Sequence, residues 1–158
     1  MDELIIRPMH CKDLDSVSNA IFTESQNGNM LAKSKTDLIA KIRQYCIAEI
    51  NGEIAGFCGW KPWCTEHAEI VSLFVFPKFR RQGIAGKLIQ ECLEIAQACG
   101  FKMFFALTTA ENVFIKSGFK KSAISLFPEK ILNDCARCPR NFGSARDPRC
   151  HEVLMAKT

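Results

Sequence analysis

The sequence predicts an α/β protein of the α+β kind, with a mixed, mostly antiparallel central sheet flanked by helices. Residues 47–60 form two apolar segments separated by an Asn-Gly pair at 51–52, which is typical of a β-hairpin. Residues 69–76 form another strand, and a basic, glycine-bearing loop at 79–87 connects it to a helix over 88–99. A hairpin and a strand-loop-helix connection in one chain indicate a mixed sheet.

The remaining elements follow from the same local patterns. Asp13 is expected to cap a helix that ends at Phe22, and Ser34 to cap a second helix. We place Tyr45 in this second helix, because apolar residues recur at helical spacing up to that position. Further strands are expected at 4–7, 102–107 and 152–156, and a short helix at 111–117.

Length and composition predict one globular domain. The chain has 158 residues, of which 47% are hydrophobic and 24% charged. No apolar stretch approaches the roughly 20 residues of a membrane span, and the acidic N-terminus does not resemble a signal peptide, so we expect a cytoplasmic protein. A net charge of +4 without a basic, aromatic-rich stripe does not favour nucleic acid as a partner. We expect a core at 1–122 and a Cys-rich C-terminal segment at 123–158 that includes the last strand.

The basic loop has the features of an anion site. It places free backbone N–H groups and the positive end of a helix dipole beside Arg80 and Arg81, which suits a diphosphate. Gly83 allows a positive φ or a close approach of the backbone to a ligand. The alternative is a tight strand-to-helix connection in which the two arginines are simply solvated.

Arg80-x-x-Gly83-x-Ala85, after an apolar strand that ends in Pro77, resembles the acetyl-CoA signature of the GCN5-related N-acetyltransferase (GNAT) superfamily. This resemblance extends to about Phe119 and implies the GNAT fold, with acetyl-CoA as cosubstrate. It implies that the loop amides bind the pyrophosphate and that the preceding strand pairs with the pantetheine arm. The residues implied in cofactor binding are Phe74, Val75, Phe76, Arg80, Arg81, Gln82, Gly83, Ile84, Ala85, Gly86, Lys87 and Asn112.

Glu69 is the expected general base. It is a carboxylate that enters an otherwise apolar strand, although a strand-end glutamate facing water fits the bare pattern equally well. Residues 68–73 read Ala-Glu-Ile-Val-Ser-Leu and resemble the Ala-Glu-Leu-x-x-Leu segment of N-acetylglutamate synthase acetyltransferase domains, whose glutamate acts as base. In the same resemblance, the backbone N–H of Val75 or Phe76 stabilises the oxyanion of the reacting thioester.

Two positions, Thr108 and Phe114, bear on the identity of the general acid. Leu107-Thr108-Thr109 is similar to the Leu-Ser/Thr-Thr segment of the same synthases, which implies Thr108 as the acid; a β-branched strand terminus is the alternative. Many GNAT relatives carry a tyrosine where this chain has Phe114. Either Thr108 or water therefore protonates the thiolate, or no acid is needed.

The acceptor is inferred from resemblance alone. Residues 30–34 resemble a Leu-x-x-Arg-Ser segment, which implies that Lys33 meets an amino-acid carboxylate; a solvated lysine at a helix start is the alternative. Residues 127–130 stand where those relatives have Leu-Pro followed by a basic residue. The chain resembles short, stand-alone amino-acid acetyltransferases more than the long, kinase-fused synthases. This resemblance implies a small amino acid as substrate, L-glutamate favoured, a role in arginine biosynthesis, and a homodimer as one possible assembly. A GNAT acting on another amine, or a non-catalytic CoA-binding or metal-binding module, remains open.

The nine cysteines fall into two groups. Six are expected to be small buried thiols: Cys11, Cys46, Cys58, Cys64, Cys92 and Cys99. The other three lie in the tail, where Cys135-x2-Cys138 and Cys150-His151 form an imperfect zinc-ligand pattern. A structural zinc, packed free thiols and a redox-labile pair all fit, so we assign no metal ligand.

Overall fold

The computed structural model describes residues 2–146 and 148–158, and its strands form a seven-stranded sheet. The strands are β1 (Leu4–Pro8), β2 (Tyr45–Ile50), β3 (Glu53–Pro62), β4 (His67–Val75), β5 (Met103–Thr108), β6 (Lys120–Lys121) and β7 (Val153–Lys157). Their order is β1-β2-β3-β4-β5-β7-β6. β4 and β5 pair in parallel, whereas β1–β2, β2–β3, β5–β7 and β6–β7 pair antiparallel. The predicted mixed, mostly antiparallel sheet is confirmed.

The helices are α1 (Leu14–Gln26), α2 (Lys35–Ala40), α3 (Ile84–Ala98), α4 (Glu111–Lys116) and α5 (Pro128–Asn133). Short 3-10 turns occur at Cys11–Asp13, Ile42–Gln44, Pro77–Phe79, Ile124–Leu126 and Cys135–Arg137. Over the described residues, none of the helices is both long and apolar enough to cross a membrane.

The chain divides into two compact units. The first unit consists of Met1–Trp60 and Ser72–Glu94, and the second consists of Lys61–Val71 and Ile95–Thr158. The division runs through β3, β4 and α3, so each of these elements contributes to both units. The prediction of a single domain with a core at 1–122 stays a prediction.

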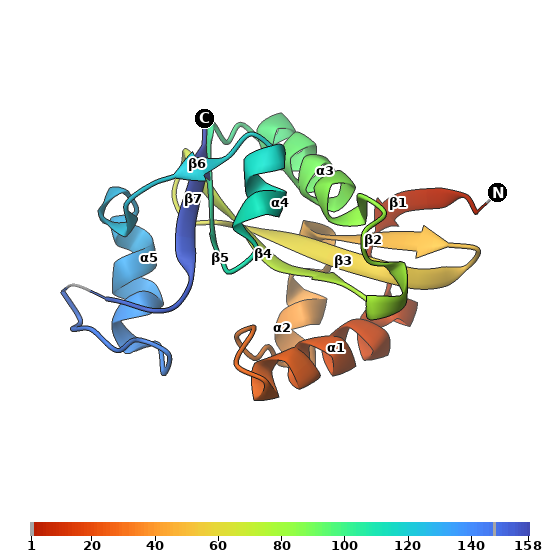
Figure 1. The fold of residues 1–158 in the computed structure, drawn as a ribbon, viewed down its shortest axis with the longest axis horizontal. Coiled ribbons are helices and arrows are strands. Elements are labelled where there is room, and N and C mark those ends of the chain that lie inside the picture. The colour runs from red at the N-terminus through yellow and green to blue at the C-terminus, as the bar shows by residue number, and fades with distance from the viewer. Residues whose placement is uncertain (1, 147) are drawn as a thin grey trace. The chain divides into compact units, whose positions relative to one another are not determined.

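In the first unit, helices cover both faces of the strands β2 and β3 (Figure 1). Figure 1 shows α1 and α2 on one face and α3 on the other. Alternate residues of β2 are therefore buried on opposite faces, as the period of a strand requires. Ile47 belongs to the apolar cluster of the α1 and α2 face, whereas the thiol of Cys46 lies 3.9 Å from that of Cys92 on α3. The buried members of the cluster are Met9, Val17, Ala20, Ile21, Leu38, Tyr45, Ile47 and Phe57.

The hairpin that joins β2 to β3 is confirmed. Asn51 and Gly52 both have positive φ, 50° and 80°, which is the backbone of the tight hairpin turn that an Asn-Gly pair favours. Further along β3, a Cβ on Gly56 would lie 2.6 Å from the carbonyl oxygen of Phe74. Only glycine therefore allows β3 and the end of β4 to come this close.

Three helix boundaries differ from the prediction by more than one residue, and the first is the end of α1, which lies at Gln26 and not at Phe22. Tyr45 begins β2 and does not continue the second helix, because α2 ends at Ala40 and the Ile42–Gln44 turn separates them. Tyr45 is 3% exposed, so burial in the apolar cluster overrides its helical spacing. α3 begins at Ile84 and not at Leu88, so the glycine loop is shorter and the helix longer than expected.

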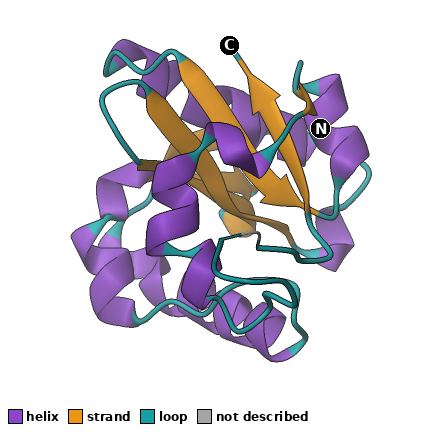
Figure 2. Ribbon diagram, turned by 90° about the vertical axis from the view of Figure 1, so that its left-hand side faces the viewer, coloured by secondary structure: helices purple, strands orange, loops and turns teal. Residues whose placement is uncertain are grey.

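The second unit has its own core. Phe105 of β5 stacks on Phe127 with ring centroids 4.1 Å apart, and Leu154 of β7 completes this buried cluster. The predicted last strand is confirmed as β7, which pairs with β5 and runs to the C-terminus (Figures 1 and 2). The segment between α5 and β7 is mostly loop, drawn in teal in Figure 2, whose viewpoint faces this side of the chain. β6 and α5 were not expected from the sequence.

Candidate active site

The glycine loop, residues 80–83, connects the Pro77–Phe79 turn to α3. Arg81 and Gly83 both have positive φ, 64° and 76°. The prediction that Gly83 takes a positive φ is confirmed. A Cβ at Gly83 or at Gly86 would meet no atom within 4 Å, so the backbone borders open space at both positions. The first N–H groups of a helix have no partner within the helix. The loop therefore offers main-chain donors to an approaching anion.

Arg80 is used differently from the expectation that both arginines flank an anion. Its Nε donates a hydrogen bond to the carbonyl oxygen of Val75 at 2.9 Å, and its guanidinium lies 5.7 Å from the ring centre of Phe74. Arg80 therefore ties the loop to the end of β4. Arg81, Gln82 and Lys87 are exposed, whereas Ile84 is buried and Ala85 is half-buried.

The end of β4 narrows the choice of oxyanion donor. The N–H of Phe76 donates to the carbonyl oxygen of Ala55 at 2.9 Å, so this amide is already used within the first unit. Of the two amides considered, we retain that of Val75. Earlier in the strand, Ser72 has a φ of 53° and its hydroxyl lies 3.1 Å from that of Tyr45. Such a backbone is rare for serine in a strand.

Glu69 is a buried carboxylate with two polar partners. The side chain of Trp63 donates from Nε1 to Oε2 of Glu69 at 2.8 Å, and Nζ of Lys130 lies 3.0 Å from Oε1. Glu69 is only 4% exposed. The alternative of a strand-end glutamate facing water is therefore wrong. A buried charge requires a compensating partner, and Lys130 supplies it.

Lys130 is itself 5% exposed and lies on α5. Its ammonium also contacts Asp134 at 2.8 Å, one turn further along the chain. Burial alone would lower the pKa of Lys130, but the charge of Glu69 and the hydrogen bond to Asp134 outweigh it and raise the pKa above its usual value. Lys130 was not among the candidate site residues. The only sequence signal for it was its place after the Phe127-Pro128 pair.

Of the remaining candidate residues, Thr108 takes part in a turn, and Asn112 and Lys33 lie on or near the surface. The hydroxyl of Thr108 accepts a hydrogen bond from the N–H of Ala110 at 2.8 Å and thus closes the turn after β5. Asn112 is exposed on α4, and Lys33 is half-buried just before α2. Phe114 is 2% exposed, with its ring edge-on to that of Phe119 at 5.1 Å, so this position belongs to the core.

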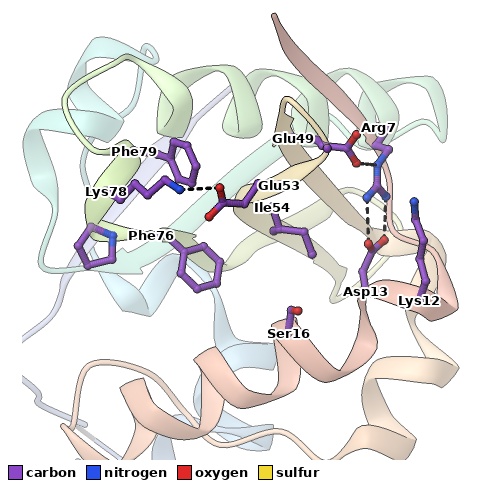
Figure 3. A pocket seen from close by; sticks show the side chains of 12 residues that line it. Arg7, Lys12, Asp13, Ser16, Glu49, Glu53, Ile54, Phe76, Lys78 and Phe79 are labelled. Carbon is purple, nitrogen blue, oxygen red and sulfur yellow. Dashed lines mark hydrogen bonds and ion pairs between the residues drawn. The ribbon is translucent and has the colours of Figure 1, made fainter. Parts of the chain in front are cut away.

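A pocket of about 650 Å³ lies in the first unit (Figure 3). Arg7 lines this pocket and makes ion pairs with Asp13 at 2.7 Å and with Glu49 at 2.8 Å. Lys78 pairs with Glu53 on another wall, as the dashed lines in Figure 3 show. These charges satisfy one another. Of the candidate site residues, only Phe76 lines this pocket.

The cysteines only partly match their predicted burial. Cys46, Cys58 and Cys92 are buried as expected, Cys64 is half-buried, and the prediction is wrong for the exposed Cys11 and Cys99. Cys135, Cys138 and Cys150 are half-buried free thiols, and burial raises the pKa of Cys135 to about 11. Within residues 2–146 and 148–158, the tail cysteines and His151 do not form a group of three metal-ligand atoms.

Comparison with known proteins identifies clear relatives. A family model described as the acetyltransferase (GNAT) family matches residues 12–119. An uncharacterized N-acetyltransferase of Chlorobaculum tepidum is 29% identical over 153 residues, which cover 97% of this chain and 95% of that protein. An amino-acid acetyltransferase of Pseudomonas syringae pv. syringae is 26% identical over 126 residues, which cover 78% of this chain but only 29% of that protein.

Solved structures of similar fold agree with this result. The N-acetylglutamate synthase of Neisseria gonorrhoeae, complexed with coenzyme A and N-acetyl-glutamate, has a TM-score of 0.80 at 21% identity over 98% of this chain and 35% of its own. The diaminobutyrate acetyltransferase EctA of Paenibacillus lautus, in complex with L-2,4-diaminobutyric acid and coenzyme A, has a TM-score of 0.69 at 18% identity over 99% and 95% of the two chains. These likenesses establish the fold.

Proposed function

Since this chain belongs to the acetyltransferase (GNAT) family, we propose that it transfers the acetyl group of acetyl-CoA to the α-amino group of a small amino acid, with L-glutamate favoured. The observation that carries this proposal is the buried carboxylate of Glu69, held by Trp63 and Lys130. The relatives named amino-acid acetyltransferases support the choice of acceptor. We also propose a role in arginine biosynthesis, as the resemblance to N-acetylglutamate synthase domains implies, and a location in the cytoplasm.

The glycine loop is the proposed binding site for the diphosphate of acetyl-CoA. Open space beside Gly83 and Gly86 lets the diphosphate approach the main-chain N–H groups at the start of α3. Arg81 and Lys87 are exposed and supply positive charge beside these groups. Arg80 acts indirectly, since its bond to Val75 holds the loop against β4. Asn112 is the proposed partner of the pantetheine arm.

The proposed reaction is a direct attack within a ternary complex. The ammonium of the acceptor gives a proton to Glu69, directly or through water, and the free amine then attacks the thioester carbonyl carbon. The N–H of Val75 stabilises the negative charge that develops on the carbonyl oxygen. As the C–S bond breaks, the thiolate of CoA takes a proton from Thr108 or from water. Lys130 keeps the buried carboxylate of Glu69 compensated by a positive charge.

A carboxylate-bearing acceptor is favoured because Lys33 provides a cation before α2. The structural likeness to EctA, which was solved with a diamino acid, supports a second candidate. In that case the acceptor is another small amine, and the transfer chemistry is unchanged.

A panel of amines tests the acceptor. Purified protein is mixed with acetyl-CoA and one candidate at a time, including L-glutamate, other amino acids, diamines and an N-terminal peptide, and release of the CoA thiol is measured. We expect the highest kcat/KM with L-glutamate. Turnover of diamines or peptides with none of L-glutamate contradicts the favoured acceptor but leaves the family chemistry intact.

Two matched pairs of variants test the residue roles. Glu69→Gln should lower kcat by about 10²–10⁴-fold while the affinity for acetyl-CoA, measured by calorimetry, stays unchanged. Glu66→Gln is the control, because Glu66 is an exposed neighbour just before β4. Thr108→Val, compared with Thr109→Val at the adjacent exposed position, tests the acid. Equal activity of the two threonine variants would exclude Thr108 as the acid.

A further inference from the structure

In the second unit, possible metal-ligand atoms of three side chains lie close together. Cys64 lies between β3 and β4, His67 is the first residue of β4, and Glu129 is the second residue of α5. Their ligand atoms all lie within 4.8 Å of one another, and all three residues are half-buried. Within the described part of the chain, this is the one group of three or more such residues.

Two of these atoms are buried without a partner. Nδ1 of His67 and Oε2 of Glu129 are inaccessible to solvent, and neither has a hydrogen-bond partner. The two atoms face each other across 3.8 Å, which is longer than a hydrogen bond. Buried polar atoms without partners cost free energy, so an unpaired imidazole nitrogen beside an unpaired carboxylate oxygen calls for an explanation. A cation between them satisfies both atoms at once.

We propose that Cys64 Sγ, His67 Nδ1 and Glu129 Oε2 bind a divalent transition-metal ion of the zinc class. Thiolate, imidazole and carboxylate are the ligands that Zn²⁺ uses, with water left for a fourth position. Ligand bonds of about 2.0–2.3 Å in a tetrahedral site place the ligand atoms roughly 3.3–3.7 Å apart. Atoms within 4.8 Å of one another therefore need to close by about 1.5 Å at most. Binding would displace the thiol proton of Cys64 to solvent.

The surroundings indicate that the ion would hold α5 in place. The ring of Phe127, just before α5, packs edge-on against His67 at 5.3 Å and stacks on Phe105 at 4.1 Å. Glu129 directly precedes Lys130, and one residue separates His67 from Glu69. A metal that joins His67 to Glu129 therefore fastens the two segments that carry the Glu69–Lys130 pair. This site is separate from the tail cysteines and does not depend on the proposed reaction.

Metal binding by the full chain tests the proposal. Chelator-treated protein is titrated with Zn²⁺ under reducing conditions, and bound metal is counted by native mass spectrometry and elemental analysis. Co²⁺ is then used as a spectroscopic probe. We expect one equivalent of metal, with the charge-transfer absorption of a single thiolate–cobalt bond. Cys64→Ser should remove that absorption, and His67→Ala and Glu129→Gln should each weaken Zn²⁺ binding by at least about tenfold.

Two controls separate this site from the rest of the chain. Cys99→Ser changes an exposed thiol and should leave metal binding unaltered, as should the double variant Cys135→Ser, Cys138→Ser. Metal binding that survives Cys64→Ser but is lost in the tail double variant would overturn the proposal in favour of the tail. No bound metal at micromolar Zn²⁺ would overturn it outright.

Alkylation of the unaltered chain gives a readout that does not require any variant to fold. Iodoacetamide is applied with and without Zn²⁺, and each labelled cysteine is identified by peptide mass spectrometry. Zn²⁺ should protect Cys64, while labelling of Cys135, Cys138 and Cys150 stays the same. Protection of the tail cysteines with no change at Cys64 contradicts the assignment.

Discussion

Nζ of Lys130 lies 3.0 Å from Oε1 of Glu69, and both side chains are almost fully buried. The pair joins α5 to β4, and Trp63 donates the remaining hydrogen bond to the carboxylate. Removing one partner of a buried ion pair leaves the other charge uncompensated, which costs more than the pair contributes as a whole. A change to either residue of the pair should therefore alter both the free energy of unfolding and the proposed proton transfer to Glu69.

Lys130→Met should lower the free energy of unfolding by about 3 kcal/mol, because it removes the cation that pairs with the buried carboxylate of Glu69. Denaturant unfolding measures this change, and Lys116→Met on the exposed face of α4 is the control. Combining Lys130→Met with Glu69→Gln should recover part of the loss, since neither charge then remains. An additive double variant would show that the two side chains do not interact.

Gly83→Ala and Gly86→Ala should have opposite effects on stability. Gly83 has a φ of 76°, so alanine there should cost about 1–2 kcal/mol. Gly86 lies in the first turn of α3, where alanine should gain about 0.5–1 kcal/mol. A Cβ at either position points into open space, so a bound diphosphate would meet both methyl groups. Calorimetry should therefore show weaker coenzyme A binding by both variants; unchanged affinity in Gly86→Ala argues against a diphosphate at this loop.

Tyr45 is the one tyrosine in the sequence, so the phenolate absorbance of the protein reports it alone. Burial raises the pKa of Tyr45 to about 12, although its hydrogen bond with Ser72 opposes this shift. Because the folded pKa lies above the unfolded value near 10, the related stability is present below pH 10 and is lost as the pH rises toward 12. Spectrophotometric titration should show ionisation near pH 12 in the folded chain and near pH 10 in denaturant. A folded value near 10 would show that the hydroxyl reaches solvent.

The carboxylate of Asp13 should stabilise the folded chain at neutral pH, and this stabilisation should be lost in acid. Burial alone would raise the pKa of Asp13, but the hydrogen bonds from Arg7 outweigh it and lower the pKa below its usual value near 3.8. The stability from this group is therefore present above about pH 4 and is lost as the pH falls through the lower folded pKa. Asp13→Asn should cost about 1–3 kcal/mol at pH 7 and progressively less below pH 4. Asp15→Asn is the control, since the side chain of Asp15 is 78% exposed.

Features with a local physical cause could be predicted from the sequence. Gly83 has the positive φ that its place in a tight strand-to-helix connection requires. The Asn51-Gly52 turn forms because this pair favours the required backbone. Ser34 caps α2 by accepting a hydrogen bond from the N–H of Asp37, as expected for serine before a helix. Each of these depends on a few consecutive residues.

Features that depend on distant partners were decided by the tertiary structure. Tyr45 fits a helical spacing, yet it forms a strand because the apolar cluster of the first unit buries it there. Glu69 was identified as a candidate from its strand, but its partner Lys130 comes from a helix that the sequence did not predict.

The sequence by itself determined the family signature, the mixed sheet and the carboxylate on β4, since each of these depends on a short stretch of consecutive residues. Only the tertiary structure decided which cation compensates Glu69 and which ligand atoms approach one another at Cys64, His67 and Glu129. The physical reason is that an ion pair or a ligand group requires atoms within a few ångströms, and spacing along the chain does not specify distance between segments that meet only on folding.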